Sequence, residues 1–201
     1  GSGPAGATGP AGATGPAGAA GSSGIAITQL SICGAGGTSL CKVGVQGPGG
    51  GTIFFVDYND LYAGFNYLEA APTSCEAQRT WSSANTDVTA ATSWAGRAVG
   101  AGQANTTAIK AVFTGDTNTN NAAYFATSCS AGGKSDWFLG SLGEMKLMYD
   151  NLQGVGGFVE YYYWSSSESN ANNAWFQIFI NGIQNTNTKT TTYYVRPVRA
   201  F

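Results

Sequence analysis

The chain contains no histidine, and only 10% of its 201 residues are charged. Without histidine, and with no C-x-x-C spacing among its four cysteines, a zinc site is not expected. Nine lysines and arginines stand against eleven aspartates and glutamates, which leaves no basic stripe for nucleic acid or for an anionic membrane. No apolar run approaches the roughly eighteen residues that a membrane span requires. We therefore expect no nucleic-acid partner and no membrane insertion.

Glycine, by contrast, is abundant and regularly placed at the start of the chain. It stands at every third position from Gly3 to Gly24, and Pro4, Pro10 and Pro16 each directly follow a glycine. Only glycine fits at the crowded axis of a collagen triple helix, whereas a flexible Gly/Ala linker has no reason to keep phase over eight glycines. The repeat predicts a truncated collagen-like stalk at residues 1–24. Because a triple helix needs three chains, it also predicts a homotrimer.

The remaining residues divide into a neck and a head. Residues 25–42 include apolar side chains at odd spacing, and we interpret them as a neck that holds three chains together. Residues 43–201 are long enough for one globular head with a proper core. Four cysteines in a chain with so few charges indicate an extracellular protein with two disulfides. Three pairings are possible, of which we favour Cys33–Cys41 and Cys75–Cys129.

Local patterns predict an α+β head with a loop-rich antiparallel sheet and two or three short helices. Expected strands are 52–57, 65–70, 161–165, 174–180, 183–186 and 193–200. Pro197 lacks a backbone donor, so the last strand should be an edge strand or carry a break there, and Asn181-Gly182 is a hairpin signal. Expected helices are 108–113 after a cap at 105–107, 121–128, and one from a Ser141–Glu144 capping box to Leu152. The last helix should bury Leu142, Met145, Met148 and Leu152 along one face.

Several motifs occur together in this order: GPGGGTIFFVD, YLEAAP, DWFLGSLGEMKLMYDN, YWSSSES, AWFQIF and YYVRPVRAF. Jointly they resemble the C-terminal domain family of the Legionella collagen-like adhesin, over most of residues 44–201. The resemblance implies a trimeric, C-type-lectin-like head displayed outside the cell that binds sulfated glycosaminoglycan. One departure is Gly140, where the family usually shows proline.

A sulfated polysaccharide would be held by basic side chains, and this chain offers scattered candidates. They are Lys110, Lys134, Lys146, Lys189, Arg196 and Arg199. Strand alternation points Arg196 and Arg199 to opposite faces unless Pro197 breaks the period. We therefore expect at most one of them to be buried, with Glu144 or Glu168 as its partner.

Aromatic side chains are the second group of candidates, because they stack on sugar rings. The run Tyr161, Tyr162, Tyr163 and Trp164 cannot be wholly buried in a strand, so part of it should face a ligand or a neighbouring subunit. Four other tryptophans are interpreted as buried anchors or core residues: Trp81, Trp94, Trp137 and Trp175. Trp164 and Arg196 are likewise expected to belong to the scaffold.

Catalysis and metal binding have weaker support. Glu168, with Asp57, Asp60 or Glu69 as a second carboxylate, leaves a glycosidase as an alternative, but we expect no enzyme. The oxygen ligands of residues 57–60 make calcium an alternative to a plain polar turn, although we expect no cofactor. The favoured function is that of an extracellular or bacterial cell-surface adhesin head that binds polysaccharide. The alternatives are the receptor-binding tip of a phage tail fibre on a virion and a non-binding cap that trimerises the stalk.

Overall fold

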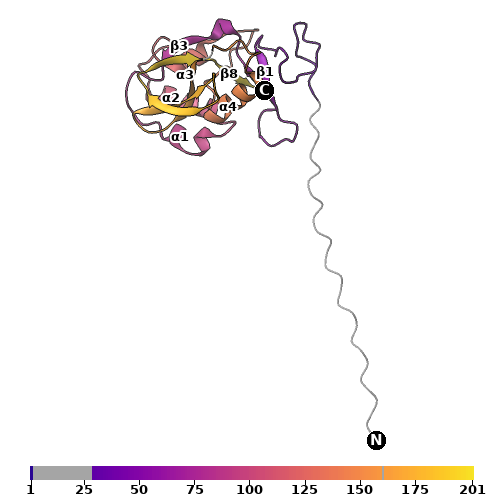
Figure 1. Cartoon of the computed structure of the whole chain (residues 1–201), viewed down its shortest axis with the longest axis horizontal. Helices are drawn as coiled ribbons and strands as arrows, with labels where there is room; N and C mark the ends of the chain where they lie inside the picture. Colours follow the sequence, from indigo (N-terminus) through magenta and orange to yellow (C-terminus); the bar gives the residue numbers. More distant parts are fainter. Residues whose placement is uncertain (2–28, 160) are drawn as a thin grey trace.

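The computed structural model describes Gly1, residues 29–159 and residues 161–201. The Gly-X-Y repeat and the first part of the predicted neck, with Ile25 and Ile27, lie outside these residues. Within the described range the chain forms a mixed α+β domain with two sheets and several short helices (Figure 1). No helix of this range is both long and apolar enough to cross a bilayer.

The smaller sheet joins the beginning and the end of the domain. Its three antiparallel strands are ordered β1 (Thr52–Val56), β2 (Tyr67–Ala70) and β8 (Val198–Ala200). The final residue, Phe201, stacks on Tyr67 with ring centroids 5.3 Å apart. The Tyr67 hydroxyl accepts a hydrogen bond from the Leu30 amide at 3.1 Å. The C-terminus therefore lies beside Leu30, near the start of the described range 29–159 (Figure 1).

The larger sheet has five strands in the order β3-β7-β4-β5-β6. Their bounds are β3 (Ala77–Thr80), β7 (Thr192–Val195), β4 (Tyr162–Glu168), β5 (Asn173–Ile178) and β6 (Gln184–Thr188). All neighbours are antiparallel except β4 and β7. The predicted hairpin at Asn181-Gly182 is confirmed, and Gly182 has the positive φ of 75° that such a turn needs. The predicted break at Pro197 is also confirmed, since β7 and β8 belong to different sheets.

Four α-helices occur in the described part of the chain, one more than the upper expectation. They are α1 (Thr89–Thr92), α2 (Gly102–Val112), α3 (Ala122–Ser128) and α4 (Leu142–Leu152). There are also two short 3₁₀ turns, η1 (Thr73–Cys75) and η2 (Ala95–Arg97). The predicted cap at 105–107 is wrong, because α2 begins earlier. Asn105 lies inside this helix and donates a hydrogen bond to the Gly96 carbonyl at 2.6 Å instead.

The predicted helix at 121–128 and the predicted capping box at Ser141–Glu144 are both confirmed. Asn121 caps α3 by accepting hydrogen bonds from the amides of Ala123 and Tyr124. Ser141 and Glu144 form the capping box of α4. The predicted apolar face of α4 is buried and packs on β1 and β4, so this helix ties the two sheets together.

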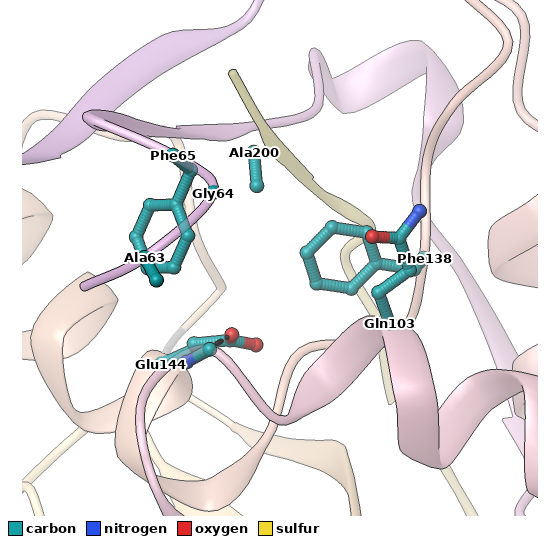
Figure 2. Close-up of a pocket in the computed structure, with 8 residues that line it drawn as sticks. Ala63, Gly64, Phe65, Gln103, Phe138, Glu144 and Ala200 are labelled. Atoms are coloured by element: carbon teal, nitrogen blue, oxygen red, sulfur yellow. Dashed lines mark hydrogen bonds between the residues drawn. The ribbon is translucent and has the colours of Figure 1, made fainter.

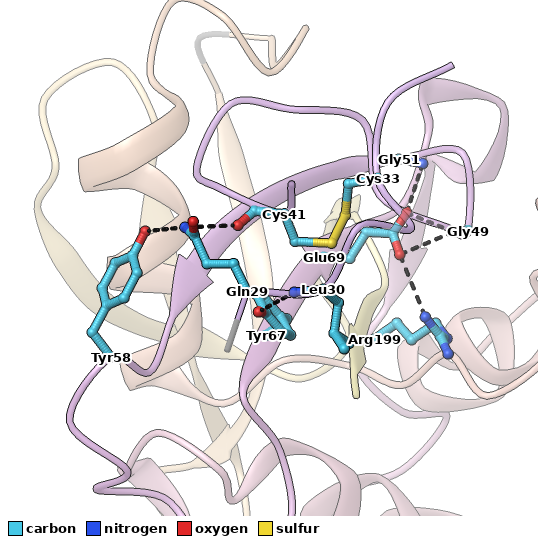
Figure 3. The surroundings of a disulfide bond; sticks show 10 residues. All are labelled: Gln29, Leu30, Cys33, Cys41, Gly49, Gly51, Tyr58, Tyr67, Glu69 and Arg199. Atoms are coloured by element: carbon cyan, nitrogen blue, oxygen red, sulfur yellow. Dashed lines mark hydrogen bonds and ion pairs between the residues drawn. A yellow bond between two sulfur atoms is a disulfide. The ribbon is translucent and has the colours of Figure 1, made fainter. Parts of the chain in front are cut away.

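Both favoured disulfides are present. Cys75–Cys129 joins η1 to the end of α3, and Cys33–Cys41 closes a small loop ahead of β1. The Cys33–Cys41 bridge is fully buried and packs with Ile53, Val56 and Tyr67. Figure 3 shows it against the smaller sheet. Residues 33–41 of the predicted neck therefore pack as part of the globular domain.

Candidate functional site

An open groove of about 470 Å³ lies between η2, the start of α4 and the β5–β6 hairpin. It is lined by Trp94, Arg97, Ala98, Leu142, Gly143, Lys146, Trp175 and Gln184. Aromatic rings, two cations and a side-chain amide therefore converge from three segments that are far apart in the sequence. This mixture of apolar faces and a few polar groups is typical of a small-ligand site.

The most unusual residue of the groove is Trp94, whose side chain is 84% exposed. The expectation that Trp94 is a buried anchor is wrong. Its ring covers the guanidinium of Arg97, whose other face lies over Trp175, and the guanidinium carbon is 4.7 Å from each ring centroid. The three side chains thus form a stack in which the cation is held between two indoles.

Two hydrogen-bond donors within this stack have no acceptor in the described part of the chain. They are the Arg97 Nε–H and the Trp175 Nε1–H. Buried donors are normally paired, and an unpaired one costs free energy. The stack therefore combines exposed aromatic surface, positive charge and unfilled hydrogen-bonding capacity. Trp175, expected in the core, is only partly buried.

The backbone beneath the stack is held tightly. The Ser93 hydroxyl accepts a hydrogen bond from the Gly96 amide at 2.9 Å, and the Gly96 carbonyl accepts from Asn105 and Ser167. Position 96 has no room for a side chain, because a Cβ there would approach the Ala90 carbonyl oxygen to 2.7 Å. The turn that presents Trp94 and Arg97 is therefore preorganised by contacts from α2 and β4.

Lys146 supplies the second cation of the groove, so this predicted ligand residue does lie at the candidate site. Its Nζ contacts Asp150 at 2.5 Å in an exposed i,i+4 pair on α4. Exposed pairs of this kind are weak and are screened by salt, so the ammonium can exchange Asp150 for an anionic ligand at little cost. Gln184 is fixed by donating to the Leu142 carbonyl and to Gln177, each at 3.0 Å.

No protein-family model and no curated protein matches the chain. The family resemblance drawn from the motifs therefore stays a prediction, and the site is argued here from its geometry.

The other predicted cations do not gather at the groove. Lys110 lies on α2, over the ring of Tyr124 and in contact with the Thr127 hydroxyl. Lys134 lies in the turn before Trp137. Of the predicted ligand-binding residues, only Lys146 lines the groove. Arg97 also lines it, although the sequence gave no reason to select this residue.

Lys189 is not a ligand contact, contrary to expectation, because its side chain is fully buried. Its ammonium lies over the Trp81 ring, pairs with Glu168 and donates to the Thr86 carbonyl. Desolvation by burial lowers the pKa of Lys189, while the Glu168 carboxylate opposes this effect. Glu168 also accepts the Val88 amide at 2.7 Å and so fixes the start of α1. The pair anchors structure instead of facing solvent.

Arg199 is also buried, and the expectation that at most one of the two C-terminal arginines is buried is wrong. Arg199 pairs with Asp136 at 2.6 Å and lies 3.6 Å from Glu69. Arg196 pairs with Glu76 at 2.7 Å, so neither expected partner is used. The reason is the break at Pro197: Arg196 lies in the break itself and Arg199 lies in β8, so each arginine finds its own carboxylate.

The glycine-rich turn before β1 holds a carboxylate. Glu69 accepts hydrogen bonds from the amides of Gly49 and Gly51 at 2.9–3.1 Å (Figure 3). Burial raises the pKa of Glu69, although these amides and Arg199 work in the opposite direction. The amides of the turn thus stabilise the buried carboxylate of Glu69, which belongs to the smaller sheet.

Part of the tyrosine run is exposed, as predicted, but the neighbouring residues Tyr163 and Trp164 of β4 are both fully buried. Tyr161 is exposed and Tyr162 is half-buried, whereas Tyr163 is fully buried, so the prediction of Tyr163 as a ligand contact is wrong. The Tyr163 hydroxyl donates to Glu76 and accepts the Val159 amide. Desolvation, together with the nearby Glu76 carboxylate, raises the pKa of Tyr163. Tyr161 and Tyr194 line a smaller surface hollow of about 160 Å³.

Another hollow, of about 170 Å³, lies beside Glu144 (Figure 2). Phe65 and Phe138 flank it, and burial raises the pKa of Glu144 to about 7. A carboxyl group with such a pKa next to a cavity is a candidate general acid. However, its oxygens already accept hydrogen bonds from the amides of Ser141 and Gly100, and the described lining holds no second titratable group. We therefore assign Glu144 to helix capping.

The polar turn at residues 57–60 is formed by its own backbone. Asp57 is buried and accepts the Tyr62 amide at 2.7 Å, and Asp60 adopts a positive φ of 52°. These contacts account for both carboxylates as turn residues. The expected absence of a cofactor, with calcium at this turn as the alternative, and the expected absence of catalysis both stay predictions.

Proposed function

We propose that this chain is the polysaccharide-binding head of an extracellular or cell-surface adhesin, carried in three copies on a collagen-like stalk. Sulfated glycosaminoglycan is the favoured ligand, and the groove around Trp94 is its binding site. The observation that carries the proposal is the exposed stack of Trp94, Arg97 and Trp175. An indole that is 84% exposed, held by a cation and flanked by unfilled donors, is better explained by a ligand than by folding.

The chemistry of the groove suits an acidic sugar polymer. The C–H faces of a pyranose ring stack on indoles, and the Trp94 ring offers such a face to solvent. Sulfate and carboxylate groups form charge-assisted hydrogen bonds with arginine and lysine, here Arg97 and Lys146. Gln184 adds a side-chain amide to the lining, a group that bonds sugar hydroxyls.

Three copies of one weak site on a common stalk account for useful affinity. A polysaccharide presents the same motif repeatedly, so binding of one head raises the effective concentration of ligand at the other two. Two disulfides support an oxidising, extracellular setting. The α+β architecture with two sheets is compatible with the proposed C-type-lectin-like fold.

The test compares Trp94→Ala and Lys146→Gln with Lys110→Gln in binding to heparin oligosaccharides and to neutral glycans. Trp94→Ala should weaken heparin binding by about 5- to 30-fold, because it removes a stacking surface worth roughly 1–2 kcal/mol. Lys146→Gln should weaken binding and reduce its salt dependence. Lys110→Gln removes the same charge from α2, away from the groove, and should change affinity less than twofold.

Two results would count against the proposal. Equal losses for Lys146→Gln and Lys110→Gln would show that net charge, not the groove, sets affinity. Binding by Trp94→Ala at the wild-type level would place the site elsewhere, and Tyr161→Ala would then test the Tyr161–Tyr194 hollow.

A further inference from the structure

Exposed apolar side chains are concentrated next to the point where the stalk meets the domain. Thirteen large hydrophobic residues are exposed in the described part of the chain, and six of them come from residues 30–61. We call these six the stalk-proximal surface: Leu30, Ile32, Leu40, Val43, Tyr58 and Leu61. Their exposed fractions run from 40% to 71%, the highest being that of Leu61. Scattered exposed hydrophobics are normal, but a concentration of them marks an interaction site.

Hydrogen bonds show that these residues belong to neighbouring segments. The Leu30 carbonyl accepts a hydrogen bond from the Cys41 amide at 2.8 Å, which joins the segment that contains Leu30 to the segment that contains Leu40. Gln29 donates both to the Cys41 carbonyl and to the Tyr58 hydroxyl (Figure 3). The Cys33–Cys41 disulfide fixes this arrangement against the smaller sheet.

The same region carries very little charge. Residues 29–66 contain three charged side chains, Lys42, Asp57 and Asp60. Asp57 is buried and engaged with the Tyr62 amide, so two charges remain on the surface of this segment. Depletion of charge around exposed apolar residues is the compositional signal of a protein–protein interface core.

The position of the stalk identifies the partner. The Gly-X-Y repeat ends at Gly24, six residues before Leu30, and six residues span at most about 20 Å even when fully extended. Three chains wound together at Gly24 therefore hold their three copies of Leu30 within about 20 Å of one axis. A surface this close to the axis faces two other copies of itself.

We propose that the stalk-proximal surface is the contact between the three heads, and that its occupants are two further copies of this chain. This inference rests on the trimer of the proposed function and names the residues that form it. Three equivalent heads around one axis make a closed ring in which each head contacts both others. The contact stabilises a stalk whose seven triplets are marginal alone, because the heads fix the register of the three chains.

The proposed contact leaves the groove free. α1, which directly precedes Trp94, lies away from the C-terminus and β1 in Figure 1, and the stalk-proximal surface adjoins both. Each trimer therefore presents three open grooves, because none of the residues that line the groove belongs to the stalk-proximal surface. Variants of the two surfaces should accordingly act independently.

The test measures the mass of the full chain in solution by light scattering and sedimentation equilibrium. The wild-type chain should be a trimer of 20.6 kDa subunits. Leu40→Arg/Leu61→Arg should raise the dissociation constant at least ~100-fold, because each trimer then places six charges in an apolar contact. Val155→Arg/Ile183→Arg adds the same charges at exposed apolar positions elsewhere and should remain trimeric. Near-ultraviolet circular dichroism checks that every variant is folded.

A wild-type monomer at micromolar concentration would overturn the inference. So would a Leu40→Arg/Leu61→Arg variant that stays as trimeric as the wild type, or a control that dissociates equally. Glycan binding on the same samples separates this inference from the proposed function. A wild-type trimer that binds no glycan refutes the function and leaves the contact standing, whereas a monomer that binds heparin does the reverse.

Discussion

Replacement of Glu144 by glutamine should change how the stability of the domain depends on pH. Glu144 is fully buried in the capping box of α4, and burial raises its pKa from 4.5 to about 7. The folded protein therefore holds a proton on this group in a pH range where the unfolded chain has released it. Its contribution to stability is fully present below pH 4.5 and is lost as the pH rises through about 7.

The size of this effect follows from the pKa difference. One pKa unit corresponds to about 1.4 kcal/mol, so the change from 4.5 to about 7 amounts to roughly 3 kcal/mol. The raised pKa of the buried Glu69 acts in the same direction. The free energy of unfolding should thus fall between pH 5 and pH 8. Glutamine keeps one acceptor oxygen for the Ser141 amide, so Glu144→Gln should remove most of the pH-dependent contribution and preserve the cap of α4. It leaves the Gly100 amide without its acceptor, so overall stability should fall at both pH values.

Urea unfolding at pH 5 and pH 8 measures how much free energy of unfolding is lost with rising pH, in the wild type and in Glu144→Gln. The pH-dependent loss should be at least ~2 kcal/mol smaller in Glu144→Gln than in the wild type. Asp150→Asn changes an exposed carboxylate on the same helix and should leave the wild-type slope unaltered. Equal slopes for the wild type and Glu144→Gln, or a wild type that gains stability toward pH 8, would refute the assignment of a raised pKa.

Two further predictions concern the supports of the groove and the buried charges. Gly96→Ala should destabilise the domain by about 1–3 kcal/mol and weaken heparin binding, because its Cβ would collide with the Ala90 carbonyl; urea titration and binding measure this. Wild-type affinity would show that the turn can relax without moving the stack. Lys189→Met should cost about 3–5 kcal/mol, since it leaves the Glu168 carboxylate buried without its cation. Adding Glu168→Gln should recover much of that loss in the same titration, and a double variant as unstable as the single would contradict the pairing.

Several parts of the fold were determined by short stretches of sequence. The capping box at Ser141, the turn at Asn181-Gly182 and the break at Pro197 each depend on the chemistry of two to four adjacent residues. Tertiary context could reinforce these signals but did not need to create them. The even set of cysteines predicted two bridges but left three pairings open, and the structure shows that the favoured pairing is the one formed.

Sequence reasoning failed where a residue's environment comes from distant segments. Lys189 looks like a surface cation, but it is buried because Glu168 and Trp81 surround it from other strands and loops. Arg196 and Arg199 find separate carboxylates for the same reason. Alternation predicts which face a side chain takes, but not what lies opposite that face.

The candidate groove itself was decided by tertiary structure. By residue type alone, Trp94 would be expected in the core, and nothing in the sequence distinguishes Lys146 from other lysines on helices. They become parts of one site only because the turn of Gly96 is anchored to α2 and β4, which brings Trp94 and Arg97 onto Trp175. The sequence alone determined the glycine period and the capping box at Ser141, because these depend on near neighbours. The exposed stack depends on contacts across about 80 residues, and such contacts exist only in the folded chain.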